Sequence, residues 1–261
     1  MSITTGLILI IVGFFAGSYG TIVGAGGGFI FVPVLLIFFK MNPAIAAGSG
    51  LVIVLVNSLS GIIGYAKQKK INYKAGVRIG FGAIPGSFAG VWLLQLQSSD
   101  SRVFFWVFAT ALVSLGIFLF TKNFSFKNAS ETAATYEQEF ESEPVVSKWF
   151  LPIGFILGIL SSYLGIGGGW LLVPILIYLF RFPTHNATAT SLFSLCLYTS
   201  TGVSLQVLYS NVDWLTVIWG GIGIILGSQL GAILSRKISS QVIIQMLSIL
   251  LIVMGIRLYF N

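Results

Sequence analysis

Two glycine-rich segments contain the residues of this chain best suited to chemistry. The first is Gly24-Ala25-Gly26-Gly27-Gly28 and the second is Gly165-Ile166-Gly167-Gly168-Gly169. Glycine lets the backbone approach a ligand closely, and a helix that begins at Gly28 or Gly169 directs its unsatisfied N–H groups and positive dipole end toward the segment. Such N–H groups bind oxyanions. We therefore predict an anion site formed by the backbone of Gly24, Gly26, Gly27, Gly28, Gly165, Gly167, Gly168 and Gly169.

The two segments belong to a duplication with a constant offset of 141 positions. Without a gap, this offset pairs Gly13 with Gly154, Gly17 with Gly158, Val32-Pro33 with Val173-Pro174, Gly61 with Gly202, and Gly86 with Gly227. Duplicated membrane halves with glycine-interrupted helices are typical of secondary transporters. The glycines spaced four apart outside the two segments are interpreted as helix-packing positions.

Hydroxyl and amide side chains follow each glycine segment. Ser49 and Thr190 occupy equivalent positions, Ser191 follows Thr190, and Asn57 corresponds to Tyr198. Neutral donors suit an oxyanion, so we expect Ser49, Asn57, Thr190 and Ser191 to bind it. Taken singly, each hydroxyl would more often bond its own helix or a neighbouring one. His185 is expected to cap a helix at the membrane interface, with a titrating gate as the alternative.

The chain lacks the groups that other chemistries need. Each of the seven acidic residues lies outside the predicted helix centres, so a carboxylate proton relay or carboxylate Na⁺ site has no candidate. We expect no metal site, no cofactor and no catalytic residues. An intramembrane hydrolase is disfavoured because His185 is the only histidine and no Gly-x-Ser-x-Gly motif is present.

Composition assigns the chain to a lipid bilayer. Of its 261 residues 56% are hydrophobic and only 8% are charged, and the mean hydropathy is +0.96. Apolar runs of about 18 to 25 residues suit a hydrocarbon core about 30 Å thick. The net charge of +7 reports orientation in such a protein, and no basic patch with base-stacking aromatics suggests a nucleic-acid partner. The single cysteine, Cys196, excludes an intramolecular disulfide.

We predict an all-α polytopic membrane protein with two homologous halves, arranged as inverted repeats, and 8 to 10 membrane segments interrupted by glycine. Residues 1–121 form the first repeat, 122–148 a polar acidic linker and 149–261 the second repeat. The expected helices are residues 6–23, 28–39, 44–66, 74–96 and 103–121, then 150–164, 169–180, 186–209, 214–234 and 241–260.

Basic residues favour a reversal of the chain at each glycine segment. A single helix over residues 6–39 would be about 51 Å long, which is too long for one crossing. Eight single passes would give parallel halves with nine basic residues on one side and five on the other. A reversal at each segment inverts the second half and gives eleven against three, which the positive-inside rule prefers. The short second helix of each half could span the membrane or re-enter it.

The doubled G-x-G-G-G-x-x-x-V-P motif, at residues 24–33 and 165–174, resembles that of the sulfite exporter TauE/SafE family. The likeness covers nearly the whole chain except the linker. Ala47-Gly48-Ser49-Gly50 and Ala189-Thr190-Ser191-Leu192 are similar to the alanine- and hydroxyl-rich stretch that follows the motif in that family. The resemblance implies a multi-pass protein of the cell (plasma) membrane that moves sulfite or organosulfonates such as sulfoacetate.

We therefore predict a secondary transporter for small sulfur-containing anions, working by alternating access with one half rocking against the other. The glycine segments with Ser49, Asn57, Thr190 and Ser191 would hold the anion. An anion channel or facilitator is the main alternative. The sequence leaves open the individual substrate, the direction of transport and whether the protein forms a homo-oligomer.

Overall fold

The computed structural model describes residues 2–96, 101–125, 147–235 and 237–259. Within these ranges the chain forms ten helices and no strand. The first five are α1 (Ile3–Val23), α2 (Gly28–Ile37), α3 (Pro43–Lys67), α4 (Tyr73–Leu96) and α5 (Ser101–Ser125). The others are α7 (Phe150–Leu164), α8 (Gly169–Tyr178), α9 (Thr184–Leu208), α10 (Trp214–Leu234) and α11 (Ser240–Tyr259). The predicted all-helical fold is confirmed.

Local signals explain where the helices begin and end. Gly24 and Gly165 terminate α1 and α7 in the left-handed conformation, with φ of 81° and 72°. Only glycine adopts this conformation without strain, so each helix stops at its glycine segment. Asn42 caps the start of α3 by accepting a hydrogen bond from Ala44 N, and Asp213 caps α10 in the same way through Leu215 N.

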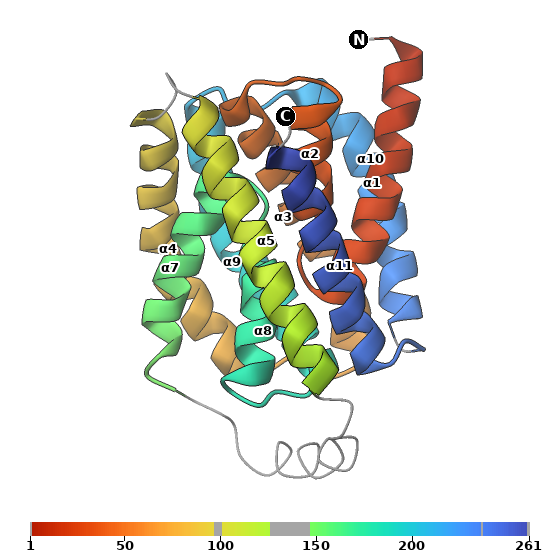
Figure 1. Ribbon diagram of the computed structural model, residues 1–261, viewed down its shortest axis with the longest axis vertical. Coiled ribbons are helices and arrows are strands. Elements are labelled where there is room, and N and C mark those ends of the chain that lie inside the picture. The colour runs from red at the N-terminus through yellow and green to blue at the C-terminus, as the bar shows by residue number, and fades with distance from the viewer. Residues whose placement is uncertain (1, 97–100, 126–146, 236, 260–261) are drawn as a thin grey trace.

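Each glycine segment reverses the chain inside the bundle. Figure 1 shows α1 running from the upper end to the middle of the molecule, where α2 turns back toward the same end. Helices α7 and α8 make the corresponding hairpin from the lower end. Seven helices are long and apolar enough to cross a membrane, whereas α2, α7 and α8 have only 10, 15 and 10 residues. The shortness of α2 and α8 fits hairpins that enter and leave at one end.

Three helix pairs account for most of the packing: α1 with α10, α4 with α7, and α5 with α11. In the first two pairs the backbones touch through glycine. A Cβ atom added to Gly17 would lie 2.6 Å from Ile224 O, and one added to Gly223 would overlap Ile10 O. Glycines of α4 and α7 meet the partner backbone in the same way, as Gly82 meets Leu151. The predicted packing role of these glycines is confirmed.

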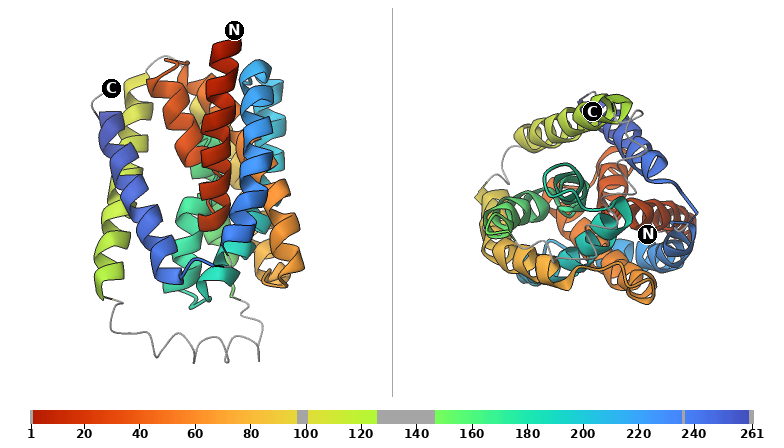
Figure 2. Two further views of the ribbon diagram at one scale, coloured as in Figure 1. Left: turned by 90° about the vertical axis from the view of Figure 1, so that its right-hand side faces the viewer. Right: turned by 90° about the horizontal axis from the view of Figure 1, so that it is seen from below.

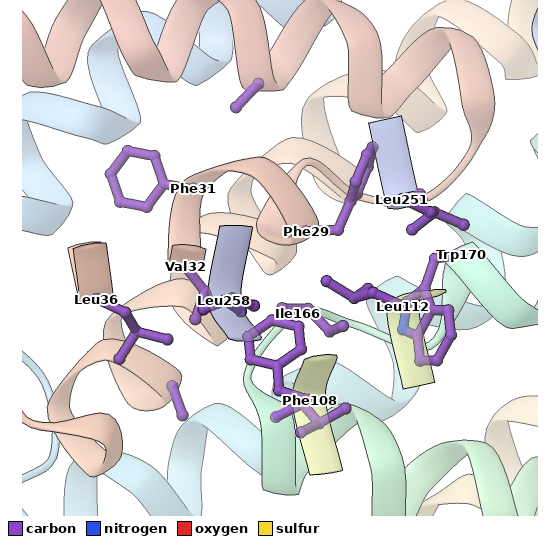
Figure 3. Close-up of a cluster of buried hydrophobic side chains, with 14 of the residues drawn as sticks. Phe29, Phe31, Val32, Leu36, Phe108, Leu112, Ile166, Trp170, Leu251 and Leu258 are labelled. Atoms are coloured by element: carbon purple, nitrogen blue, oxygen red, sulfur yellow. The ribbon is translucent and has the colours of Figure 1, made fainter. Parts of the chain in front are cut away.

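The α5–α11 pair lies together along one side of the bundle (Figure 2) and covers the two short helices. Buried apolar side chains fill the space between them. In Figure 3, Phe29 of α2 lies near Leu251 of α11, while Trp170 of α8 lies near Leu112 of α5. The outer surface exposes large apolar side chains such as Phe15, which suits contact with lipid.

The predicted linker, residues 122–148, is described only at its ends. Helix α5 continues through Lys122 to Ser125, since this stretch holds no proline or glycine to stop it. The described chain resumes at Ser147. Residues 126–146, which carry the acidic run, lie outside the described residues.

Basic residues are concentrated at one end of the bundle. At the lower end in Figure 1 lie the end of α5, the start of α7 and the α3–α4, α8–α9 and α10–α11 connections. By their positions in these elements, nine of the basic residues within the described ranges belong to this end: Lys67, Lys69, Lys70, Lys74, Arg78, Lys122, Lys148, Arg181 and Lys237. The upper end holds both described chain ends and three: Lys40, Arg102 and Arg257.

Candidate functional site

The two glycine segments cross in the interior of the molecule. A Cβ atom added to Gly28 would lie 2.8 Å from both Cα and O of Ile166, and one added to Gly169 would lie 2.8 Å from Ala25 Cα. Ala25 and Ile166 are fully buried. We call residues 24–28 and 165–169 together the glycine crossing. The structure thus brings together the two segments in which the sequence predicts an anion site.

One apolar side chain from each central helix packs into the glycine crossing. Val54 of α3 lies against Gly26, Gly28 and Gly167, each of whose added Cβ atoms would come within 2.8 Å of a Val54 methyl carbon. Leu195 of α9, at the equivalent position, lies 2.8 Å from a Cβ atom added to Gly169. The centre of the crossing is therefore closely packed.

The short helices begin at the crossing with open backbone N–H groups. Ile30 and Phe31 donate to Gly27 O, and Leu171 and Leu172 donate to Gly168 O. Among the described residues, no acceptor pairs with the N–H groups of the first two residues of each helix, which are Gly28, Phe29, Gly169 and Trp170. All four residues are buried, and the positive ends of the helix dipoles lie at the same place.

Asn57 is fully buried on α3, one turn beyond Val54. Its Oδ1 accepts a hydrogen bond of 3.1 Å from Thr21 Oγ1, in the last turn of α1. Its Nδ2 has no partner in the part of the chain that the structure describes. Tyr65 supports this arrangement by donating to Thr21 O at 3.1 Å. Asn57 therefore offers a free, neutral donor close to the first glycine segment.

Tyr198 occupies the position on α9 that Asn57 occupies on α3. It is fully buried, and its hydroxyl oxygen accepts a hydrogen bond of 2.9 Å from Gly168 N. The amide of Gly168, one of the predicted anion donors, is therefore already paired.

The predicted ligands Ser49 and Thr190 make equivalent contacts on opposite sides of the crossing. Ser49 Oγ accepts from Asp213 N at 2.9 Å, just before α10, and Thr190 Oγ1 accepts from Asn72 N at 3.0 Å, just before α4. Ser191 Oγ donates to Gly24 O at 2.8 Å and ties α9 to the first glycine segment. All three side chains are fully buried. His185 lies in the first turn of α9, five residues before Thr190.

Several buried polar residues near the crossing were not among the predicted site residues. Thr21 of α1 and Ser162 of α7 stand at equivalent positions in the last turn before each glycine segment. Ser162 Oγ has no partner within the described ranges, and Gln206 Nε2 donates to Ser162 O at 3.3 Å. A hydroxyl side chain in an apolar helix, directly before a glycine segment, is the sequence feature that could have identified Thr21 and Ser162.

The described side chains found at the crossing, Val54, Leu195, Asn57, Tyr198 and Ser191, are neutral. The one acidic residue within the described ranges is Asp213, whose carboxylate accepts from Leu215 N and Thr216 Oγ1 at the start of α10. Those ranges contain no group of three or more histidine, cysteine or acidic side chains that could hold a metal ion. The arrangement provides neutral hydrogen-bond donors and helix dipoles, which attract anions.

Comparison with known proteins supports a transport function. The model of the family described as "Sulfite exporter TauE/SafE" matches residues 9–258. The chain is similar to the probable membrane transporter protein YunE of Bacillus subtilis (strain 168), with 32% identity over 98% of this chain and 97% of the relative. A probable membrane transporter protein of Methanocaldococcus jannaschii is 32% identical over 95% of this chain and 93% of its own length.

No solved structure matches the chain. The family model covers nearly all of the sequence, and the relatives align almost from end to end. The chain therefore belongs to the TauE/SafE sulfite exporter family of multi-pass membrane proteins, and its relatives are named as probable membrane transporters.

Proposed function

We propose that this protein is a secondary transporter that carries small sulfur-containing anions, such as sulfite or organosulfonates like sulfoacetate, across the membrane by alternating access. Family membership supports the class of substrate through the family's name. The observation that carries the proposal is the glycine crossing, where open backbone N–H groups at two helix starts meet deep in a membrane protein. An oxyanion is the ligand that such groups favour.

Neutral donors suit a carrier because it must release its substrate. A buried lysine or arginine would hold an anion strongly in a low-dielectric interior. Here Asn57 Nδ2 and the N–H groups at the start of α2 would replace part of the hydration shell without a full opposing charge. Ser49, Thr190 and Ser191 are proposed to position the helices around the anion, since their hydroxyls already bond backbone groups.

We further propose that the two halves are inverted repeats. Three observations support this. Helices α2 and α8, and α3 and α9, begin and end at positions related by the offset of 141. The contacts are reciprocal, since α1 packs on α10 as α7 packs on α4, and Ser49 pairs with Asp213 as Thr190 pairs with Asn72. The hairpins also enter from opposite ends (Figure 1). The lower end, rich in basic residues, is then cytoplasmic.

The packing suggests which parts move. Rocking of one half against the other, as expected from the sequence, would separate α1 from α10 and α4 from α7, whose backbones touch. We propose instead two moving units that each combine both halves: α1, α2, α3 and α10 in one, and α7, α8, α9 and α4 in the other. They meet at the α3–α9 contact and at the glycine crossing.

The test is transport by the purified protein in proteoliposomes. Radiolabelled sulfite and sulfoacetate should enter with saturation, and unlabelled anion trapped inside should accelerate entry by counterflow, because a carrier exchanges substrate across the membrane. Uptake that is linear in concentration and shows no counterflow would indicate a channel. Absence of uptake of either anion, with sulfate, phosphate and chloride tested beside them, would refute the proposed substrate class.

Uncoupler added in the same assay tests energy coupling. No carboxylate lies in the centre of a helix within the described ranges, so a built-in proton relay has no candidate there. We expect facilitated transport that the uncoupler leaves unchanged, or coupling only through the protonated form of the anion. In the second case, uptake follows the fraction of protonated anion as the external pH is varied.

A further inference from the structure

We propose that the two glycine segments are unequal: the transported anion binds at the first, while the hydroxyl group of Tyr198 permanently occupies the corresponding place at the second. Each chain then binds one anion, not two. This inference rests on the proposed function and specifies the site within it.

The backbone differs between the two segments at one position. Gly24 and Gly165 share a left-handed conformation, with φ of 81° and 72°, and so do Gly26 and Gly167, with φ of 82° and 74°. At the next position Gly27 has φ of 77°, whereas Gly168 has φ of −91°. The peptide groups leading into α2 and α8 are therefore oriented differently.

The neighbouring helices explain this difference. Gly20 of α1 has Ser161 of α7 as its counterpart. A Cβ atom on Gly20 would overlap the backbone nitrogen of Gly27, so the left-handed Gly27 fits against α1 only because residue 20 is glycine. Ser161 carries that Cβ atom. The second segment is thereby excluded from the first segment's conformation, and Gly168 takes a right-handed one.

The side chains facing the two segments differ at the same place. At the second segment, Gly168 N donates to the Tyr198 hydroxyl at 2.9 Å. A neutral hydroxyl oxygen therefore occupies the place where an anion oxygen would accept this hydrogen bond. At the first, the shorter Asn57 reaches Thr21 instead and keeps an unpartnered Nδ2 with none of its side chain exposed. A buried donor without a partner is unfavourable unless a ligand supplies the acceptor.

The donors at the first segment share one face. Val54 touches Gly26 and Gly28, and Asn57 lies one turn further along the same helix. Asn57 therefore lies on the face of α3 that packs against the glycine crossing, and its hydrogen bond to Thr21 directs it toward the end of α1, next to the first segment. The N–H groups of Gly28 and Phe29 are open at the start of α2. An oxyanion with several oxygens, such as sulfite or a sulfonate, suits donors from both elements.

Electrostatics also favours one anion. The segments touch, since an added Cβ atom on Gly28 would lie 2.8 Å from Ile166 O. Two anions bound at such close range in a low-dielectric interior would repel each other strongly. The tyrosine hydroxyl satisfies the second segment without adding charge, so the dipoles of both short helices act on a single ligand.

Equilibrium binding of radiolabelled sulfite to the purified protein in detergent tests the inference. We expect one site per chain in the wild type. Asn57→Asp, which keeps the shape but replaces the amide donor with a carboxyl group, should weaken binding at least tenfold. Asn57→Leu, which removes every hydrogen-bonding group of the side chain, should do the same. Tyr198→Phe is the comparison variant: it removes the hydroxyl that pairs with Gly168 N but keeps the ring, and the first bound anion repels a second, so it should keep one site with affinity within about twofold of the wild type.

Size-exclusion profiles and thermal melting identify variants that fail to fold. If one of the two Asn57 variants fails to fold, the other still tests the inference. Two sites in the wild type, or equal loss of binding in the Asn57 and Tyr198 variants, would overturn the inference while leaving the transporter proposal intact. No sulfite binding and no transport by the wild type would instead refute the proposed function, and this inference with it.

Discussion

At the scale of single residues, Ser49 and Thr190 show how a hydroxyl in a membrane helix can serve the backbone. Each accepts a hydrogen bond from the residue that precedes another helix, Asp213 before α10 and Asn72 before α4. A backbone N–H in this position has no intrahelical acceptor. The two hydroxyls therefore fix where α10 and α4 begin relative to α3 and α9.

Replacing these hydroxyls should affect stability more than binding. We expect Ser49→Ala and Thr190→Val each to lower the free energy of unfolding by about 1–3 kcal/mol, because a buried N–H loses its acceptor. The affinity for sulfite should change less than threefold. Thermal melting and sulfite binding, measured on the same preparations, check both parts. A large loss of affinity at unchanged stability would instead make them ligands of the anion.

The sequence predicts most residues of the proposed site but not its asymmetry. The glycine segments are conspicuous because consecutive glycines are unfavourable in a helix. Asn57 could be selected as a buried amide following the first segment. Pairing of Gly168 with Tyr198 could not be predicted, since it depends on where a side chain of α9 lies relative to a turn thirty residues earlier. Such contacts between distant segments leave no local pattern.

At the scale of helices, two pairs pack through glycine ridges. Helices α1 and α10, and α4 and α7, contact through backbone atoms with little side-chain volume between them. In lipid the hydrophobic effect does not drive helices together, so close van der Waals contact between small residues takes its place. The large apolar side chains remain free to face the acyl chains.

Two glycines on α10 provide a matched test of this packing. A Cβ atom on Gly223 would overlap Ile10 O of α1, whereas one on Gly221 would meet nothing within 4 Å. We expect Gly223→Ala to reduce stability by about 1–3 kcal/mol through overpacking. Gly221→Ala should leave stability unchanged or raise it by up to about 1 kcal/mol through helix propensity. Thermal melting in detergent measures both. Equal effects would show that backbone contact does not stabilise the pair.

Helix positions were predictable because their ends are local. Glycine stops α1 and α7, Asn42-Pro43 starts α3, and the apolar runs between them have membrane length. The structure places α8 at Gly169–Tyr178, close to the expected 169–180. The pairing of α1 with α10 was harder to predict from the sequence. Glycine spacing marks a packing face but does not say which of several similar faces it meets.

At the scale of the whole molecule, the distribution of basic residues supports the proposed orientation. Lys40 follows α2 and Arg181 follows α8, at equivalent positions of the two hairpins, yet they lie at opposite ends of the bundle. If the halves were parallel in the membrane, these two residues would face the same side.

Labelling of single cysteines distinguishes the two arrangements. In a Cys196→Ala background, Lys40→Cys should react with a membrane-impermeant maleimide added to intact cells, because the positive-inside rule puts the other end in the cytoplasm. Arg181→Cys should react only after the membrane is opened. Both variants should retain transport. Reaction of both, or of neither, in intact cells would contradict the inverted arrangement.

A disulfide tests which units move. Ser60 Oγ of α3 and Ser228 Oγ of α10 lie 2.5 Å apart, close enough for a bond between the corresponding cysteines. Because both helices belong to one proposed unit, Ser60→Cys with Ser228→Cys should transport sulfite equally well oxidised and reduced in the Cys196→Ala background. The single cysteine variants serve as controls. Transport that requires a reductant would show that the halves themselves separate.

The exchange of partners between the halves also has a consequence for biogenesis. When the first half has entered the bilayer, α1 and α4 have been made but their glycine faces have no partner, because α10 and α7 come later in the chain. The ribosome must therefore deliver almost the whole protein before α1 can dock. Until then α1 lacks the helix against which its glycine face packs. Under the proposed inverted arrangement, a gene fragment encoding either half alone would need a second, oppositely inserted copy to pack the same surfaces.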